Sequence, residues 1–459
     1  MVNIYVPNAH DTISPDELKL YHLIMEYRAT ANLPVIPLSA GLSATAGRHA
    51  VDTYENIWVA GLQLPEGANL HSFSDAPYYS DHSAAEVMWF APQRLNTSYP
   101  DYGFEISAAG SRTVEGALAG WQGSSGHDNV IMNRSIWSDW TWEAIGIGVE
   151  INQDYSVPYQ GNIHHVWFGR SPDPGGAPLI EGTDEADEMK GTQFDDTIGA
   201  GGGDDRVTGE NGHDEIDGGS GRDTIHGGEG NDTLAGGSNF DTVLYTGIFA
   251  PVALNLEAGR ATGGGGTDRL SEIEHAIGGA SHDTIYGTKT HGNRIEGSAG
   301  EDTLYGLSGR DTLLGGDSDD RLYGGSDGDQ LFGGAQNDFL DGGPGRDLLT
   351  GGPGADNFVL RSISDTAVGQ YVRDEIRDFS AAEGDRINLF LVDADVTQAG
   401  DQAFTEVERF TGEAGELVLQ SLVRSGRDVT LASMDVDGDG RADGQLYIVG
   451  TASVDDFIL

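Results

Sequence analysis

The chain has 459 residues, enough for roughly two to four domains, and carries a formal net charge of -49. This acidity argues against nucleic-acid phosphate or an anionic membrane as a partner and favours cations. Cysteine is absent, which excludes disulfides and thiolate metal sites. No apolar run is long enough to span a membrane, and no basic start followed by an apolar stretch predicts an N-terminal signal peptide.

Residues 1–171 contain all seven Trp and most of the Tyr, which indicates an ordinary globular domain. Its first helix is predicted by Ser14 as N-cap, Pro15 at the first helical position and Glu17 completing a capping box. This helix should end before Pro34. Its expected apolar face consists of Leu20, Leu23, Ile24 and Tyr27.

A second helix is expected after Ser39. A third should place Val114, Ala117, Leu118 and Trp121 on one face. The stretches AIGIGVEI and HHVWFG, residues 144–151 and 164–169, are predicted strands. The pattern predicts a mixed α/β domain.

Several short motifs of this domain are similar to those of the CAP superfamily, in its SCP-like bacterial branch. They are YHLIMEYRATANLPVIPLS, LSATAGRHAVD, LHSFSD, GFEIS and WQGSSGHDNVIM, followed by the two predicted strands. The resemblance covers residues 14–170 and implies an α-β-α sandwich. It also implies a cleft formed by His71, Glu105 and His127, with Glu115 as the best counterpart of the second family glutamate.

Two imidazoles and one or two carboxylates that converge on a cleft could bind zinc. Alternatively, His71 and Glu105 form a structural hydrogen bond. His164 and His165 are adjacent on a strand and point to opposite faces, so at most one can reach the cleft. None of the thirteen His begins an HExxH motif, and no Ser-His-Asp arrangement is recognisable.

Residues 172–181 are rich in Pro and Gly and are predicted to be a linker. A nine-residue repeat fills residues 182–244 and returns, after a strand-like segment at 245–277, over residues 278–359. Each unit has an Asp, and two residues later an aliphatic residue, Met or Phe; Gly292-Asn293 breaks the rule. The aspartates are Asp187, Asp196, Asp205, Asp214, Asp223, Asp232, Asp241, Asp283, Asp302, Asp311, Asp320, Asp329, Asp338, Asp347 and Asp356.

The glycines of each unit predict a turn, and the last three residues a short strand whose middle side chain enters a core. Stacked coils would bring like-charged carboxylates together, so a cation is required, and calcium accepts such oxygen ligands. A flexible acidic tail is the alternative, but it would not keep an aliphatic position in phase. The repeats resemble the nonapeptide GGxGxDxUx of RTX proteins, which implies parallel β-rolls.

Residues 360–459, with DEIRDFSAAEGDRINLFLVDAD and the ending VDDFIL, resemble the C-terminal domain of serralysin-type proteins. This resemblance implies a β-rich domain, a type I secretion apparatus as partner and an extracellular location. Within it, Asp435, Asp437, Asp439 and Asp443 have the spacing of a calcium loop, although Leu446 stands where an EF-hand needs Glu. A charged hairpin turn is the alternative.

The sequence thus predicts a multidomain chain: a CAP-like domain, two β-rolls and a β-rich end. The preferred function is a secreted calcium-binding protein whose CAP domain binds a small apolar ligand, such as a lipid, or a cell-surface ligand without turnover. A metal-assisted hydrolase at the His/Glu cleft and a calcium-dependent adhesion or matrix protein are the alternatives.

Overall fold

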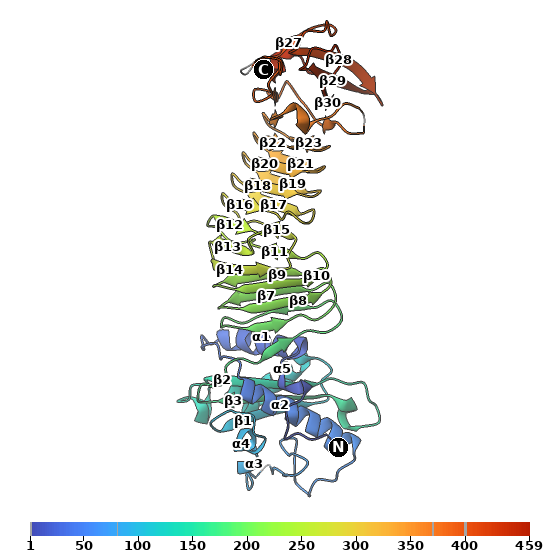
Figure 1. The fold of residues 1–459 in the computed structure, drawn as a ribbon. Coiled ribbons are helices and arrows are strands. Elements are labelled where there is room, and N and C mark those ends of the chain that lie inside the picture. The colour runs from blue at the N-terminus through green and yellow to red at the C-terminus, as the bar shows by residue number, and fades with distance from the viewer. Residues whose placement is uncertain (1, 80, 370, 399–401) are drawn as a thin grey trace. The chain divides into compact units, whose positions relative to one another are not determined.

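The computed structural model describes residues 2–79, 81–369, 371–398 and 402–459, and it divides into two compact units, Met1–Gly219 and Ser220–Leu459. The first unit holds nearly all the helices, and parallel β-coils dominate the rest of the chain (Figure 1). None of the helices formed by the described residues is long and apolar enough to cross a membrane.

In the first unit, a three-stranded antiparallel sheet of order β1-β3-β2 has helices on both faces. Its strands are β1 (Gly103–Ala109), β2 (Ala144–Glu150) and β3 (Ile163–Gly169). The helices are α1 (Pro15–Ala29), α2 (Ala40–Val51), α3 (Glu86–Trp89), α4 (Ala91–Arg94), α5 (Val114–Gln122) and α6 (Ser125–Ile131), with a π-helix at Asp52–Val59. The predicted helices and strands of this region are confirmed.

The α1 capping box is present. The Glu17 backbone N–H donates to the Ser14 hydroxyl oxygen, and the Ser14 backbone N–H donates to the Glu17 carboxylate at 2.8 Å. The predicted apolar face of α1 is partly wrong. Leu23 and Tyr27 are only half-buried, whereas Met25 and Arg28 are buried. The reason is that α1 contacts β2 and α5 as well as the first strands of the repeats, so it has more than one covered side.

Helix α2 lies directly against the sheet because β2 offers glycines where it crosses. A Cβ on Gly146 would lie 2.1 Å from the backbone of Leu42, and one on Gly148 would lie 2.2 Å from that of Ala46. Side chains at these two positions would push the helix away. The close approach brings α2 side chains onto the face of the sheet that carries Glu105 and His165.

The β-coils of the first unit begin at Leu179, inside the stretch predicted as a linker, and Ile180 bridges to Ile13. Strands alternate between two parallel sheets, with β4 pairing β6 and β6 pairing β8 in one, and β5 pairing β7 in the other. Their bounds are β4 (Leu179–Glu181), β5 (Glu188–Lys190), β6 (Thr197–Gly199), β7 (Arg206–Asn211) and β8 (Glu215–Ser220).

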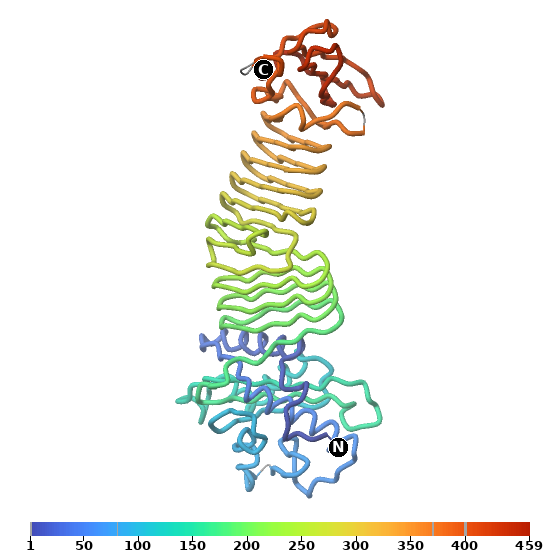
Figure 2. The backbone as a smooth tube through the Cα atoms, viewed as in Figure 1, coloured from blue at the N-terminus to red at the C-terminus, as the bar shows by residue number. Residues whose placement is uncertain are grey.

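In the second unit, successive coils stack with the same alternation (Figure 2). The strands are β9 (Thr224–Glu229), β10 (Thr233–Ser238), β11 (Thr242–Leu244), β12 (Val252–Asn255), β13 (Arg260–Gly263), β14 (Gly266–Ser271), β15 (His275–Ile277), β16 (Thr284–Tyr286), β17 (Arg294–Ala299), β18 (Thr303–Ser308), β19 (Thr312–Asp317), β20 (Arg321–Ser326), β21 (Gln330–Ala335), β22 (Phe339–Asp341), β23 (Leu348–Thr350) and β24 (Asn357–Val359). The segment at 245–277 inserts the antiparallel strands β12, β13 and β14 into one of the sheets.

Every predicted aliphatic position of the repeats is buried, and along each sheet these side chains stack in register, as Ile285, Leu304 and Leu322 do. The coil also continues past residue 359, because β25 pairs with β23 and β26 with β24. The C-terminal strands are β25 (Asp374–Ile376), β26 (Arg386–Asn388), β27 (Thr405–Glu406), β28 (Glu416–Arg424), β29 (Arg427–Asp435), β30 (Gly444–Val449) and β31 (Phe457–Ile458).

Candidate functional site

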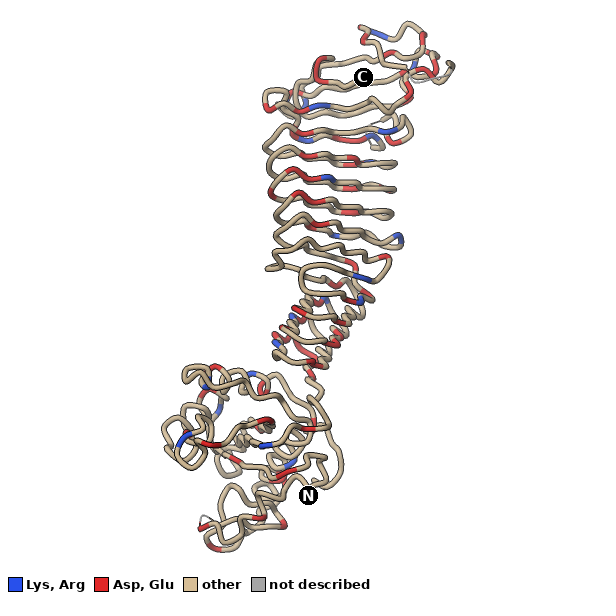
Figure 3. The backbone as a smooth tube through the Cα atoms, turned by 90° about the vertical axis from the view of Figure 1, so that its left-hand side faces the viewer, with Lys and Arg blue, Asp and Glu red and all other residues tan. Residues whose placement is uncertain are grey.

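The repeat aspartates form ladders along the coils, and acidic residues recur from coil to coil (Figure 3). In the second unit, the N–H of a repeat Asp typically donates to the Oδ1 of the Asp one coil further on, as from Asp302 to Asp320 at 2.7 Å and from Asp320 to Asp338 at 2.8 Å. A parallel ladder runs from Asp311 to Asp329 at 2.8 Å. The Oδ1 atom of each of these acceptors therefore holds the turn one coil earlier in place.

The second carboxylate oxygen of these residues is buried and has no hydrogen-bond partner. This applies to Asp302, Asp311, Asp320, Asp329, Asp338, Asp347 and Asp356. Burial raises the pKa of Asp302 and Asp329 to about 8. Buried carboxylate oxygens without partners are costly, and they are the hard oxygen ligands that calcium takes. The residues fit a calcium ion, which would supply the missing positive charge.

Glycine lies beside nearly every ladder carboxylate because a larger side chain would fill the space beside the carboxylate; Ala200 takes this position before Asp205. A Cβ on Gly297 would lie 2.3 Å from Oδ2 of Asp302. Gly316 has φ +121°, a conformation that other residues rarely adopt. The glycines thus shape the cradle and the aspartates line it.

The same backbone-to-carboxylate ladders run through the first block. Within the first unit, Asp187 N donates to Asp205 Oδ1 at 2.8 Å and Asp196 N to Asp214 Oδ1 at 2.9 Å. Asp223 N donates to Asp241 Oδ1 at 2.8 Å in the second unit. Asp187, in the first complete repeat, is only half-buried.

The ladders extend to four acidic residues that the nine-residue spacing missed. Asp347 N donates to Asp374 at 2.9 Å, and Asp356 N donates to Asp385 at 3.0 Å. In the segment at 245–277, Asp268 and Glu274 continue the ladders from Asp232 and Asp241, each at 3.0 Å. Asp-x-aliphatic recurs at Asp268, Asp374 and Asp385, so this shorter signal would have found three of the four.

Asn293, which breaks the repeat, replaces a carboxylate oxygen with a donor. Its Nδ2 donates to the Glu274 carbonyl at 2.6 Å, while its Oδ1 accepts from Thr288 N at 2.7 Å. The ladder still passes through it, because Asn293 N donates to Asp311 Oδ1 at 2.6 Å. Both amide atoms of Asn293 are therefore hydrogen-bonded within the protein, unlike the carboxylates of Asp302 and Asp311, which each keep one unpartnered oxygen.

The predicted calcium loop in the C-terminal region joins β29 to β30. Oxygens of Asp435, Asp437 and Asp443 lie within 4.8 Å of one another, and Asp435 is buried. Asp435 accepts from the N–H groups of Gly438 at 2.8 Å and Gly440 at 2.9 Å. Asp439 is outside this group and accepts from Arg441 N.

A cavity of about 570 Å³ lies beside β1, the edge strand of the N-terminal sheet. His71, Glu105 and His127 all line it. Burial, followed by the neighbouring His71, lowers the pKa of His127. Glu115 lies elsewhere, about half exposed on α5 and paired with Lys19 at 2.6 Å, so its prediction as the second carboxylate of the cleft is wrong.

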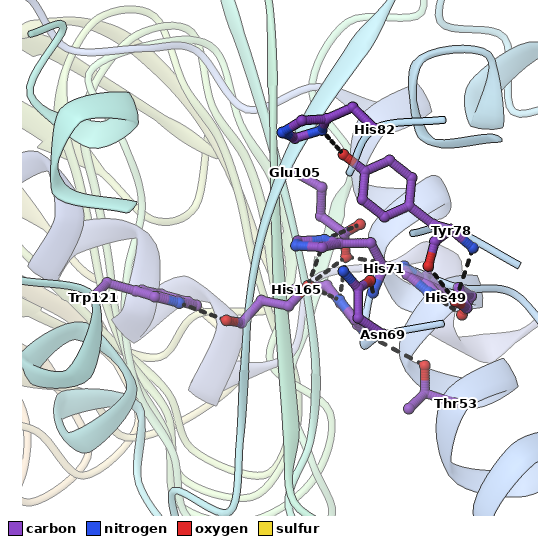
Figure 4. Close-up of polar contacts among 11 residues, drawn as sticks. His49, Thr53, Asn69, His71, Tyr78, His82, Glu105, Trp121 and His165 are labelled. Carbon is purple, nitrogen blue, oxygen red and sulfur yellow. Dashed lines mark hydrogen bonds and ion pairs between the residues drawn. The ribbon is translucent and has the colours of Figure 1, made fainter. Parts of the chain in front are cut away.

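Glu105 is fully buried and is contacted by three imidazoles (Figure 4). The Nδ1 atoms of His71 and His49 each lie 3.0 Å from its carboxylate, and the ring of His165 is the third imidazole in contact with it. Burial alone would raise the pKa of Glu105, but the three histidines outweigh it and hold the pKa well below its ordinary value. The charged carboxylate is therefore stable inside the domain.

His49 had no predicted role at the site, and His165 is the one of the adjacent pair His164 and His165 that reaches it. His49 is on α2, which the glycines of β2 bring close, and His165 faces Ser107, its register partner on β1. His49 Nε2–H donates to the Ser72 carbonyl at 3.0 Å, and its Nδ1 faces Glu105, to which it donates only when the imidazole is protonated. His164 points to the opposite face, as expected, where burial lowers its pKa to about 4.

A metal ion could be held at either of two overlapping sets of ligands. Ligand atoms of His49, Glu105 and His165 lie within 4.8 Å of one another, although the two imidazoles are stacked with centroids 3.9 Å apart. His71 and His127 offer imidazoles from the cavity side. Imidazole nitrogen and carboxylate oxygen are ordinary zinc ligands.

The outer wall of the cavity is aromatic. Phe104 contacts Trp140 and Trp137 with centroids 5.0 and 5.6 Å apart, and the two tryptophans contact each other at 4.8 Å. Trp89 and Met88 complete this wall. The cavity thus combines a broad apolar surface with one buried polar cluster at its base, as small-molecule sites do.

Residues 236–459 match the family of the M10 peptidase serralysin C-terminal domain. Residues 181–216 and 208–243 match the RTX calcium-binding nonapeptide repeat. The chain therefore carries calcium-binding RTX repeats and a serralysin-type C-terminal domain, features typical of proteins exported by type I secretion.

None of the curated proteins matches this chain. Among solved structures it is similar to two subunits, R3 and R2, of a mannuronan C5-epimerase from Azotobacter vinelandii. The identities are 22% and 21%, the TM-scores 0.18 and 0.20, and the matches cover 39% and 40% of this chain and 78% and 91% of the others. An extracellular lipase from Serratia marcescens is 16% identical with a TM-score of 0.14, over 62% of this chain and 40% of the lipase.

Proposed function

We propose that the protein is a secreted calcium-binding protein whose N-terminal domain is CAP-like and binds a small, largely apolar ligand without turnover. The observation that carries this is the cavity, where Trp137, Trp140 and Phe104 face a buried Glu105. The sheet with helices on both faces and the shared cavity of His71, Glu105 and His127 support the CAP assignment.

The chemistry of the cavity specifies the ligand's two ends. An apolar body would cover the tryptophans, and burying such surface stabilises a complex by about 25 cal/mol per Å² before the costs of association. A hydroxyl end could donate to Glu105, whereas a carboxylate end would be repelled by it. A long-chain alcohol therefore fits better than the corresponding fatty acid.

The test is titration of the full, calcium-loaded chain with dodecanol, followed by tryptophan fluorescence. Trp140→Ala should weaken binding at least tenfold, because the ring supplies much of the apolar wall. Trp58→Ala is the control, since Trp58 contacts Tyr159 and does not line the cavity. Equal affinity of both variants for dodecanol, or tighter binding of dodecanoate than of dodecanol, contradicts the proposal.

A second candidate is metal-assisted hydrolysis, favoured by the histidines that surround Glu105. Zinc, when bound, would supply an activated water. His71, His127 and Glu105 would hold it from the cavity side, or His49 and His165 with Glu105 from within. In that case the purified chain retains about one zinc per molecule, and Glu105→Gln loses it while Glu115→Gln does not, as metal analysis would show. Absence of zinc from the unaltered chain after zinc loading eliminates this candidate.

A further inference from the structure

The C-terminal region contains a groove that is rich in arginine, in a chain with 25 basic and 74 acidic residues. The groove has a volume of about 870 Å³, and Arg346, Arg373 and Arg424 line it. Glu375 is the one acidic residue among its lining residues. The groove therefore has a local excess of positive charge on a strongly acidic molecule.

The register of the sheet explains why these side chains meet. Gln420 on β28 is opposite Leu431 on β29, and Leu431 is opposite Tyr447 on β30. Tyr447 is in turn opposite Glu375 on β25, so one row of side chains crosses four strands. Arg346 precedes β23, which pairs with β25. The groove is thus part of a sheet and does not depend on a loose surface loop.

Arg373, which directly precedes β25, is held in position against this row. Its guanidinium lies 5.0 Å from the centroid of Tyr447 and donates to Gln445 Oε1 at 3.2 Å. Partial burial lowers the pKa of Arg373, and the neighbouring Arg346 and Arg424 add to this effect. The three guanidinium groups repel one another, and an anion between them would relieve that repulsion.

Glu375 neutralises the groove only in part. It pairs with Arg346 and with Arg377, each at 3.6 Å, which is long for a charge-assisted hydrogen bond. The planar guanidinium groups can instead bind a carboxylate in a bidentate manner. Leu422, Leu431 and Gln420 add apolar and amide contacts beside the charges.

We propose that this groove binds an acidic polysaccharide through the carboxylates of its sugar units. A uronic-acid chain carries one charge per ring, which suits arginines spread along a groove and leaves ring faces and hydroxyls for Leu422 and Gln420. Duplex nucleic acid fits less well, because its phosphate charge, one per about 1.7 Å of helix axis, would be repelled more strongly by the acidic coils. The site is separate from the N-terminal cavity and from the calcium ladders.

The experiment uses the full, calcium-loaded chain and polygalacturonate oligomers as probe, with binding measured by calorimetry. Replacing Arg346, Arg373 and Arg424 together by Gln should weaken binding at least tenfold. The charge-matched control replaces the exposed residues Arg206, Arg310 and Arg321 by Gln and should change the affinity less than twofold. Binding should also weaken as salt is raised.

Two further measurements separate loss of binding from loss of folding and test the role of the carboxylates. The single change Arg424→Gln, at an exposed residue, should weaken binding severalfold without affecting folding, which melting curves would check. Methyl-esterified oligomers should not bind, since they lack the carboxylates. Equal affinity of the two triple variants, binding of the ester, or tighter binding of single-stranded DNA than of polygalacturonate would each overturn the proposal.

Discussion

Removal of calcium at pH 7.5 should unfold the repeats from about Gly182 to Val359. The ladders bury carboxylates with one oxygen unpartnered, from Asp302 to Asp356. Two charged carboxylates about 4.8 Å apart, the strand spacing, repel by roughly 3 kcal/mol at an effective dielectric of 20. Without the cation this repulsion accumulates along both ladders. The apolar core is too small to offset it, because each strand contributes only one aliphatic side chain.

Circular dichroism in excess chelator measures this directly, and a full β-sheet signal at pH 7.5 would contradict it. Asp320→Asn should lower calcium affinity severalfold, because Asp320 is buried in a ladder. Asp317→Asn is the matched control, three residues away and exposed. Similar calcium affinities for the two variants would mean that the ladder oxygens are not the ligands.

The calcium-free repeats should also be more stable in acid than at neutral pH. Burial raises the pKa of Asp320 and Asp356 to about 7 and that of Asp338 to about 8, from an ordinary 3.8. A group whose pKa is raised in the folded state contributes stability below its ordinary pKa and loses it as pH rises towards the folded value. Chelated protein should therefore keep more β-sheet signal at pH near 4 than at pH near 8.

The sequence predicted the repeats well because each unit repeats the same local physics. An Asp, a turn of glycines and a buried apolar side chain identify the coils from Asp187 to Asp356, except at Asn293 and in the segment at 245–277. The prediction stopped there because it relied on a spacing of nine residues. Asp374 and Asp385 occupy equivalent turns after longer loops, and a loop of any length can close a coil if its strand keeps register.

The N-terminal cavity was harder to predict, because its residues come from separate elements. His71, Glu105 and His127 were placed in one cleft by family resemblance alone. His49 belongs to a helix that is buried on nearly all sides, and only the close packing of α2 on Gly146 and Gly148 shows that it reaches Glu105. The prediction that Glu115 lies in the cleft is wrong for a similar reason, because sequence distance does not show that α5 directs its side chain towards Lys19.

Replacing Glu105 should destabilise the N-terminal domain more than any change at an exposed acid. Glu105→Gln removes the carboxylate that His49, His71 and His165 all contact, and removing one partner of a buried charge pair costs about 3–5 kcal/mol. Glu115→Gln breaks an exposed pair with Lys19 and should cost less than about 1 kcal/mol. Tryptophan fluorescence isolates this domain, because all seven Trp lie within residues 1–171.

The pH dependence of this domain should be opposite to that of the calcium-free repeats. Burial lowers the pKa of His164 and His165 to about 4, from an ordinary 6.5. A histidine whose folded pKa is depressed contributes stability above its ordinary pKa and loses it as pH falls towards the folded value. The melting temperature reported by tryptophan should therefore fall between pH 6.5 and pH 4. An unchanged melting temperature over this range would mean that both imidazoles can be protonated inside the domain without cost.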